Sequence, residues 1–365
     1  MLLATPKITP KLRVELDELD DLRRRLGDQA GSAGPWIGSL RRQVRATSAN
    51  SSISIEGFHV PERDRVAVVS GEQQPDPTDE SRMALACYAR AMHHVGVMAA
   101  DPGFRWLDRV ILDLHFDACS FQRDKSPGLW RTGPSGVTRP GGGELAYQGP
   151  DGKAAPRLMG AVVKWLERGD LNAHVVVRGA MAHLHVVSVH PFRDGNGRIS
   201  RIVQSLVLAR EGLLAPEFGS IEEYLGRHTP EYYAALQAAS GGRYQPERDA
   251  GDWVAFCVGA HLEQARHRLA QMAQAGTRWS RLERMVGHRG WPDRLVIALE
   301  QSLFQGADRM SYSREAEVSA ATASADFRRL LDAGLVAQEG RGRTTRYVAS
   351  EAVRREVQEA VGKRA

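Results

Sequence analysis

The chain has 365 residues, 42% of them hydrophobic and 25% charged, a composition typical of a folded globular protein and not of a disordered one. Three scattered cysteines exclude a disulfide framework, and no apolar stretch reaches the roughly 18 residues that span a bilayer. The formal net charge of +5 is spread over 49 basic and 44 acidic residues, which favours a generally Arg-rich composition over a nucleic-acid footprint. Because Met1–Arg13 also lacks the apolar core of a signal peptide, we expect a cytoplasmic protein without a membrane segment.

The predicted fold class is mainly α. Residues 1–105 form an N-terminal helical region, because Leu12–Leu26 and Glu80–Met98 repeat apolar residues at helical spacing. The polar segment Gly71–Thr78 between them contains prolines and predicts a loop.

Residues 106–245 form the next region, which opens with an apolar helix over Trp106–Phe121 and continues through a Gly- and Pro-rich stretch, Pro127–Pro150. Residues 246–289 are predicted to be a helical extension or linker of one or two helices.

The composition changes again over residues 290–350, which form a separate predicted unit, and 351–365 is left as a tail. The unit combines three predicted helices with two short strands about a Gly-Arg-Gly turn: Leu295–Leu303, Ser313–Val318, Ser319–Ala333, Leu335–Glu339 and Thr344–Val348.

The segment His190–Arg201 carries the chemistry. Pro191 disfavours helix in the residue before it, so the apolar helix over Met181–Val189 ends there and places His190 at its end. The glycines of Gly195–Gly197 then let the backbone turn tightly into a second helix, whose N-terminus suits a pyrophosphate.

Charged residues complete this segment. Arg198 and Arg201 lie three positions apart on one helix face and can pair with phosphate oxygens. Asp194 precedes the glycines, where one carboxylate together with phosphates would hold Mg²⁺. His190 can take the proton from an attacking hydroxyl. Alternatively, His190 only caps its helix and the glycines only make a turn.

The same segment resembles the Fic signature, His-x-Phe-x-(Asp/Glu)-Gly-Asn-Gly-Arg-x-x-Arg, with all eight specified positions present. The resemblance implies a Fic helical core and transfer of AMP from ATP to a Ser, Thr or Tyr hydroxyl of a target protein. It also implies a role for each motif residue: His190 as base, Asp194 as Mg²⁺ ligand, Gly195, Asn196 and Gly197 as anion hole, Arg198 on the phosphates and Arg201 on the γ-phosphate.

A second motif precedes the first. Ser52, Glu56 and Gly57 resemble the family's inhibitory pattern, (Ser/Thr)-x-x-x-Glu-(Gly/Asn), on a helix expected over residues 48–57. The resemblance implies that Glu56 pairs with Arg201 and fills the space that the γ-phosphate needs. It also raises the possibility that the site removes AMP. The alternative is an ordinary helix end with an exposed glutamate.

The resemblance further implies a β-hairpin flap between Arg131 and Pro150 that aligns the target by strand addition. Its expected strands and turn are Val137–Arg139, Glu144–Gln148 and Pro140–Gly143. Tyr232 resembles a residue that borders the adenine pocket, although packing is the commoner role for such a tyrosine.

Two nearby histidines, His183 and His185, do not predict zinc, because residues two apart on a helix face nearly opposite ways.

The unit at 290–350 resembles a winged helix-turn-helix. Its candidate contact residues lie on the recognition helix and the wing: Thr322, Ser324, Arg328, Arg341, Arg343 and Arg346. Because Asp326 lies on the same helix, docking to a protein, including a second copy in a homodimer, is favoured over DNA binding. The rival interpretation of the whole chain is a DNA-binding regulator whose Fic domain senses nucleotide.

Overall fold

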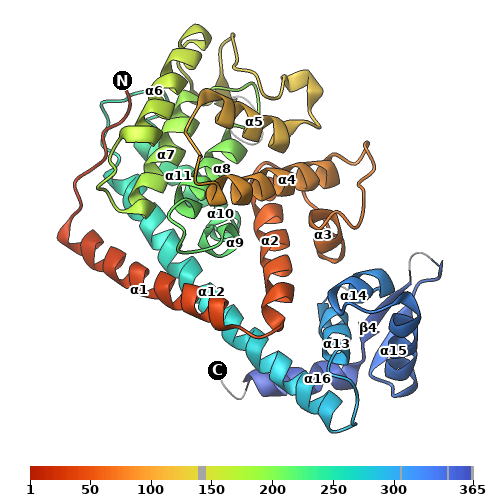
Figure 1. Ribbon diagram of the computed structural model, residues 1–365. Helices are drawn as coiled ribbons and strands as arrows, with labels where there is room; N and C mark the ends of the chain where they lie inside the picture. Colours follow the sequence, from red (N-terminus) through yellow and green to blue (C-terminus); the bar gives the residue numbers. More distant parts are fainter. Residues whose placement is uncertain (139–144, 305, 343–344, 363–365) are drawn as a thin grey trace.

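A computed structural model describes residues 1–138, 145–304, 306–342 and 345–362. Helices make up most of the fold and two short antiparallel strand pairs complete it, which confirms the predicted mainly α class (Figure 1). Within these ranges no helix is both long and apolar enough to cross a bilayer. All three cysteines are unpaired and buried.

Four helices form the N-terminal region: α1 (Pro10–Ser32), α2 (Trp36–Ile55), α3 (Glu62–Val69) and α4 (Glu80–Ala100). Thr9 caps α1 by accepting a hydrogen bond from the Leu12 N–H, and Asp79 caps α4 in the same way. The helix expected over residues 48–57 is the last part of the longer α2, and Gly71–Thr78 is a loop as predicted.

The central region contains seven helices, two short 3₁₀ turns and one hairpin in its described part. They are α5 (Asp108–Cys119), η1 (Arg123–Lys125), β1 (Gly136–Thr138), β2 (Leu145–Gln148), η2 (Gly152–Ala154), α6 (Ala155–Arg168), α7 (Val175–Val189), α8 (Asn196–Ala209), α9 (Pro216–Gly219), α10 (Glu222–Arg227) and α11 (Thr229–Ser240). Strands β1 and β2 pair antiparallel with Val137 opposite Tyr147. Arg139 and Glu144, expected at the strand ends, and the expected turn Pro140–Gly143 lie outside the described residues.

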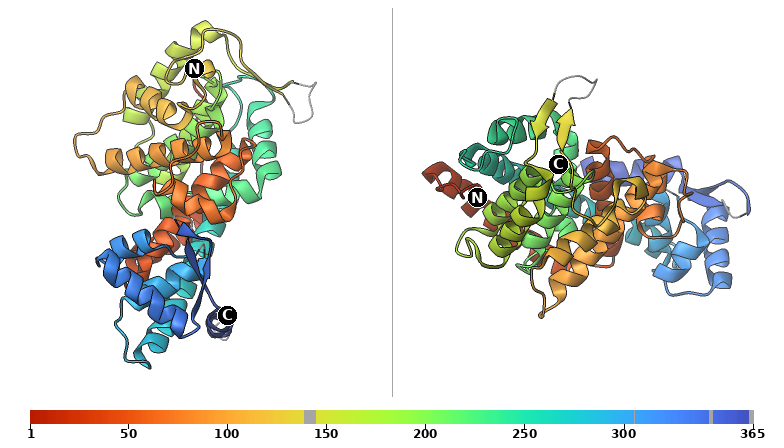
Figure 2. Two further views of the ribbon diagram at one scale, coloured as in Figure 1. Left: turned by 90° about the vertical axis from the view of Figure 1, so that its right-hand side faces the viewer. Right: turned by 90° about the horizontal axis from the view of Figure 1, so that it is seen from above.

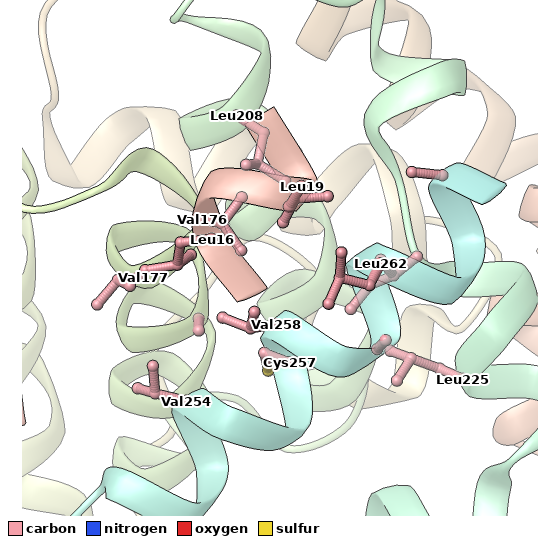
Figure 3. Close-up of a cluster of buried hydrophobic side chains, with 14 of the residues drawn as sticks. Leu16, Leu19, Val176, Val177, Leu208, Leu225, Val254, Cys257, Val258 and Leu262 are labelled. Carbon is pink, nitrogen blue, oxygen red and sulfur yellow. The ribbon is translucent and has the colours of Figure 1, made fainter. Parts of the chain in front are cut away.

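Residues 246–289, predicted as a helical extension or linker of one or two helices, contain one long helix, α12 (Gly251–Gly287), which is part of two hydrophobic cores. Its first half packs between α1 and α7, where Leu16, Val177 and Val258 meet (Figure 3). These side chains are almost fully buried. The predicted linker is therefore structural, because its apolar residues cannot leave either core without exposing it.

A second core joins α4 to α5, α7 and α8 around Leu85, Ile111, Phe192 and Ile202. The predicted boundary at residue 105 therefore does not separate two packing units. The turn between α7 and α8 carries the Fic-like segment.

The C-terminal module, residues 290–362, lies beside the far end of α12, and Figure 2 shows it apart from the central helices. Its elements are α13 (Leu295–Phe304), α14 (Arg309–Glu315), α15 (Ala320–Asp332), β3 (Val336–Glu339), β4 (Arg346–Ala349) and α16 (Glu351–Gly362). The predicted tail forms α16 because Val353 and Val357 are buried against α12. Three helices and a β3–β4 hairpin appear in the predicted order.

Candidate active site

The turn between α7 and α8 presents His190. Helix α7 ends at Val189, as Pro191 predicts, and His190 follows in the left-handed conformation with φ of 49°. Its ring Nδ1 lies 3.2 Å from the carbonyl oxygen of Val187. Since a carbonyl oxygen can only accept, Nδ1 carries the hydrogen and Nε2 keeps a lone pair.

The surroundings keep this imidazole neutral. Burial lowers the pKa of His190 to about 4, and the Arg131 guanidinium acts in the same direction. The hydrogen bond to Val187 and the carboxylates of Glu56 and Asp194 oppose this shift without cancelling it. At neutral pH, His190 is therefore unprotonated, as a general base must be.

Residues Phe192–Gly197, here called the anion loop, close tightly before α8. The Asn196 side chain bonds to both backbone groups of Phe192, accepting from its N–H at 2.9 Å and donating to its oxygen at 3.0 Å. Gly195 has φ of 76°, and a Cβ there would clash with Cys119 Sγ. The Asn196 side chain therefore holds the loop, and the N–H groups of the first turn of α8 are left to face an anion.

The carboxylate of Asp194 lies at the edge of this loop and is 36% exposed. Gln122 connects it to Arg198: its amide donates to Asp194 Oδ2 at 2.9 Å and accepts from Arg198 Nη2 at 2.8 Å. Among the described residues, no group of three or more His, Cys, Asp or Glu could hold a metal alone. One exposed carboxylate beside an anion loop fits Mg²⁺ bound jointly with phosphates.

His115 supports the loop from α5. It accepts a hydrogen bond from the Gly128 N–H at 2.9 Å and donates to the Asp194 carbonyl oxygen at 3.0 Å. Its ring stacks on Phe192 with centroids 3.5 Å apart and planes 4° from parallel. Because burial lowers the pKa of His115 to about 4, it is a neutral part of the scaffold.

The two arginines of the motif have different surroundings. Arg198 is fully buried, with its guanidinium 5.7 Å from the Phe58 ring centroid and 5.5 Å from that of Phe121. Arg201 points to α2 instead, where Nε bonds to Ser52 Oγ at 2.7 Å and Nη2 bonds to the Ser52 carbonyl oxygen at 2.9 Å. A direct contact of Arg198 with phosphates remains a prediction.

Glu56 meets Arg201 over the anion loop. The residue follows the last turn of α2, and Gly57, with φ of 89°, ends the helix as expected. Glu56 Oε1 lies 2.8 Å from Arg201 Nη2. A Cβ on Gly197 would overlap this carboxylate oxygen, so Glu56 lies directly against the start of α8.

A cavity of about 470 Å³ opens beside these groups. It is lined by residues from the turn between α7 and α8, here called the catalytic turn, and from the hairpin, the C-terminal end of α2 and α11. Among them are Glu56, Tyr147, His190, Gly197, Arg201 and Tyr233. Tyr232 also borders it but is 1% exposed, and its hydroxyl lies 2.9 Å from His183 Nε2. Tyr232 is therefore largely a packing residue, whereas Tyr233, at 44% exposure, offers more surface to a ligand.

The two histidines of α7 have separate environments. His183 bonds to Gln204 and Tyr232, whereas His185 packs edge-on against Trp165. They do not face a common site.

Sequence reasoning missed Gln122, His115, Arg131 and Tyr147. The Tyr147 hydroxyl donates to the Ser188 carbonyl oxygen beside the catalytic turn. All four come from segments far from the motif in sequence, and none belongs to a recognisable short pattern. Only their contacts in the folded chain identify them.

In the C-terminal module, Asp326 does not face outward. It accepts hydrogen bonds from Arg294 at 2.8 Å and from the Tyr312 hydroxyl at 2.8 Å, and it is 2% exposed. The negative charge of Asp326 is therefore not presented on the surface of α15, and it does not argue against a polyanionic partner there.

The candidate contact residues of the module have mixed surroundings. Thr322 and Ser324 bond within the first turns of α15, while Arg328 and Arg341 are exposed. Arg346 is partly buried, and Arg343 lies outside the described residues.

Residues 106–208 match the model of the Fic/DOC family. Protein adenylyltransferase fic-1 from Caenorhabditis elegans is 37% identical over 86 residues, which are 23% of this chain and 16% of that protein. A probable protein adenylyltransferase from Aquifex aeolicus is 34% identical over 79 residues, 22% of this chain and 24% of its own length. The chain thus spans a quarter or less of these curated relatives.

The fold extends further than the sequence likeness. A Fic family protein from Desulfovibrio desulfuricans has a crystal structure that aligns with 95% of this chain and 98% of its own, with a TM-score of 0.61 and 19% identity. At that identity the likeness concerns the fold alone. Together with the motif and the family match, it leads to one conclusion: residues 106–208 of this chain form a Fic domain.

Proposed function

We propose that the chain transfers AMP from ATP to a Ser, Thr or Tyr hydroxyl of a target protein. The observation that carries the proposal is that one cavity is bordered both by His190, whose Nε2 keeps a lone pair, and by Gly197 of the anion loop. A base and a phosphate cradle on one cavity suit nucleotidyl transfer. The names of the curated relatives agree with this activity.

In the proposed reaction, the target hydroxyl oxygen attacks the α-phosphorus of ATP. A bond forms between this oxygen and the α-phosphorus, and the bond from the α-phosphorus to the oxygen bridging to the β-phosphorus breaks, releasing pyrophosphate. His190 Nε2 accepts the hydroxyl proton. The first N–H groups of α8 face the phosphates and orient them.

Asp194 is the residue that would hold Mg²⁺, with the phosphates as further ligands. A metal bound there would neutralise charge on the phosphates and on the leaving pyrophosphate. Gln122 orients the Asp194 carboxylate for this role.

We also propose that Glu56 inhibits the enzyme. Its carboxylate lies on Gly197 and pairs with Arg201, the residue expected to hold the γ-phosphate. A γ-phosphate at Arg201 would meet this carboxylate at close range, where like charges repel. With the γ-phosphate displaced, the α-phosphorus is misaligned for attack. Removal of AMP, with Glu56 orienting a water, is the second activity open to the same site.

The target segment is expected to add as a strand to the β1–β2 hairpin, since β1 is exposed along its length. For the C-terminal module we propose docking of a protein or binding of a polyanion such as DNA, since the buried Asp326 no longer argues against the second.

Incubation with ATP labelled at the α-phosphate tests the function. Label on the chain or on lysate proteins, lost with His190→Ala, is the expected result. If the Glu56→Gly variant binds ATP but labels nothing, the alternative of a nucleotide-sensing regulator gains, and DNA binding by the whole chain should then be measured.

A further inference from the structure

Arg131 lies between the catalytic turn and the hairpin, five residues before β1 begins at Gly136. Its residue is only 2% exposed. Burying a guanidinium is costly unless its donors are satisfied, so its partners indicate what the residue is for.

Among the described residues, the partners of the Arg131 side chain are all main-chain carbonyl oxygens. On the catalytic turn, Nε donates to His190 at 2.6 Å and Nη2 donates to Val189 at 3.4 Å. At the base of the hairpin, Nη1 donates to Gly133 at 2.6 Å and Nη2 donates to Pro150 at 2.6 Å. One planar group thus joins both ends of the hairpin to the catalytic turn.

The Arg131 backbone adds to this connection, because its N–H donates to the Pro191 carbonyl oxygen at 2.9 Å. Gly149, just after β2, fits between the two parts: a Cβ there would be 3.1 Å from Arg131 Nη2 and 3.5 Å from His190 Cβ. The hairpin base therefore packs directly on the catalytic histidine.

No carboxylate of the described residues pairs with Arg131, so the guanidinium is not there to neutralise an acid. A neutral side chain of similar length, such as Met, could fill the space but offers no donors. The guanidinium differs from such a side chain because its rigid set of donors reaches both the hairpin base and the catalytic turn.

We propose that Arg131 is a positioning residue, which fixes the main chain of His190 and the base of the target-aligning hairpin in one geometry. The inference rests on the proposed function for its kinetic consequences but not for its structural ones. A target strand on β1 would then be registered against Nε2 of His190 by the same side chain that holds the histidine in its left-handed conformation.

The charge of Arg131 has a separate effect. Among the described residues, the charged groups that act on the pKa of His190 are Arg131, Glu56 and Asp194, and of these Arg131 alone disfavours the imidazolium. Removing it should raise the pKa of His190. A base works unprotonated, so the rate falls as the pH drops through that pKa, and the fall would then begin at higher pH.

The first test needs no enzymatic activity. Hydrogen exchange is measured on wild type, Arg131→Lys, Arg131→Met and the control Arg123→Ala, an exposed residue on η1. Backbone amides at 148–152 and at 188–192 should exchange at least fivefold faster in both Arg131 variants and remain unchanged in the control. Faster exchange in only one segment, or in neither, would overturn the coupling.

The second test uses the Glu56→Gly background to measure self-labelling and ATP affinity. In both Arg131 variants the labelling rate at saturating ATP should fall at least tenfold, while ATP affinity changes less than twofold. Only Arg131→Met should move the acid limb of the pH profile upward, because Lys keeps the charge.

These two tests separate the possible failures. If Glu56→Gly alone does not label, the proposed function fails and hydrogen exchange still decides the positioning role. If Glu56→Gly labels and folded Arg131→Lys labels at the control rate, the positioning role is wrong.

Discussion

The segment His190–Arg201 contacts the hairpin region on one side and α2 on the other, and each contact involves a buried arginine. On the hairpin side, the described partners of the Arg131 side chain are main-chain carbonyl oxygens, which belong to the fold itself. On the α2 side, Arg201 bonds to Ser52 and to the carboxylate of Glu56, whose side chain is 22% exposed. The Arg131 contacts are made to the main chain, whereas the Arg201 contacts include the Glu56 carboxylate, which another anion could replace.

The electrostatics of the two sides agree with this difference. Burial lowers the pKa of Arg131, and Tyr147 and the Asp151 carboxylate act in the opposite direction without cancelling this shift. Burial also disfavours the charge of Arg201, but the Glu56 carboxylate outweighs it, and the pKa of Arg201 is raised. The α2 side therefore places a carboxylate beside its buried arginine, whereas the hairpin side places main-chain carbonyl oxygens around its own.

His190→Ala gives the largest expected effect, because it removes the imidazole that is proposed to act as the general base. General-base catalysis contributes roughly 10²- to 10⁴-fold, so labelling in the Glu56→Gly background should fall by about that factor. ATP affinity should hold, since the imidazole acts on the hydroxyl. Labelling within a few-fold of the parent would remove His190 from this role.

Glu56→Gly tests the contact between the end of α2 and Arg201. Freeing Arg201 from the carboxylate should raise labelling at least tenfold at equal ATP and Mg²⁺, since misalignment of about an ångström can cost on the order of a hundredfold. Adding Arg201→Ala should lower it again. The control is Glu62→Ala, an exposed glutamate on α3. Equal labelling by wild type and Glu56→Gly would refute inhibition and leave the role of His190 unaffected.

Asp194→Ala tests the carboxylate at the edge of the anion loop. The variant should lower both labelling and ATP affinity in the presence of Mg²⁺, because the carboxylate and the phosphates share the ion. EDTA should reduce the parent to the level of the variant. Labelling that is insensitive to EDTA would exclude a metal at Asp194.

Gln122→Met gives the smallest expected change. It keeps the volume but removes both hydrogen bonds of Gln122, leaving only the direct Asp194–Arg198 ion pair at 3.5 Å, so the Mg²⁺ concentration for half-maximal labelling should rise several-fold. Gln122→Glu keeps an acceptor for Arg198 and places a like charge beside Asp194, so it separates the two bonds. A half-maximal concentration identical to that of Arg123→Ala would mean that Gln122 only fills space.

The parts predicted from the sequence are those encoded by neighbouring residues. Pro191 located the end of α7, and the glycines located the start of α8. The Glu56–Arg201 pair, 145 residues apart, was reached only through a second motif. Arg131 lies 59 residues from His190, and Gln122 lies 72 residues from Asp194. Neither belongs to a motif, so only the fold brings them to the site.

The sequence also leaves open which helices share a core. Helical periodicity marks which face of a helix is buried but not against what. It therefore could not show that α4 shares a core with α8, or that residues after Ser350 return to cover α12.

Helix α12 has a consequence for cooperativity. Its 37 residues extend about 55 Å at roughly 1.5 Å per residue, with Trp253 in one core and Leu282 in another. Neither core can melt without fraying a helix that the other still needs. We therefore expect a single heat-absorption peak in calorimetry, and a chain cut after residue 290 would leave Trp279, Leu282 and Val286 without the side chains that cover them.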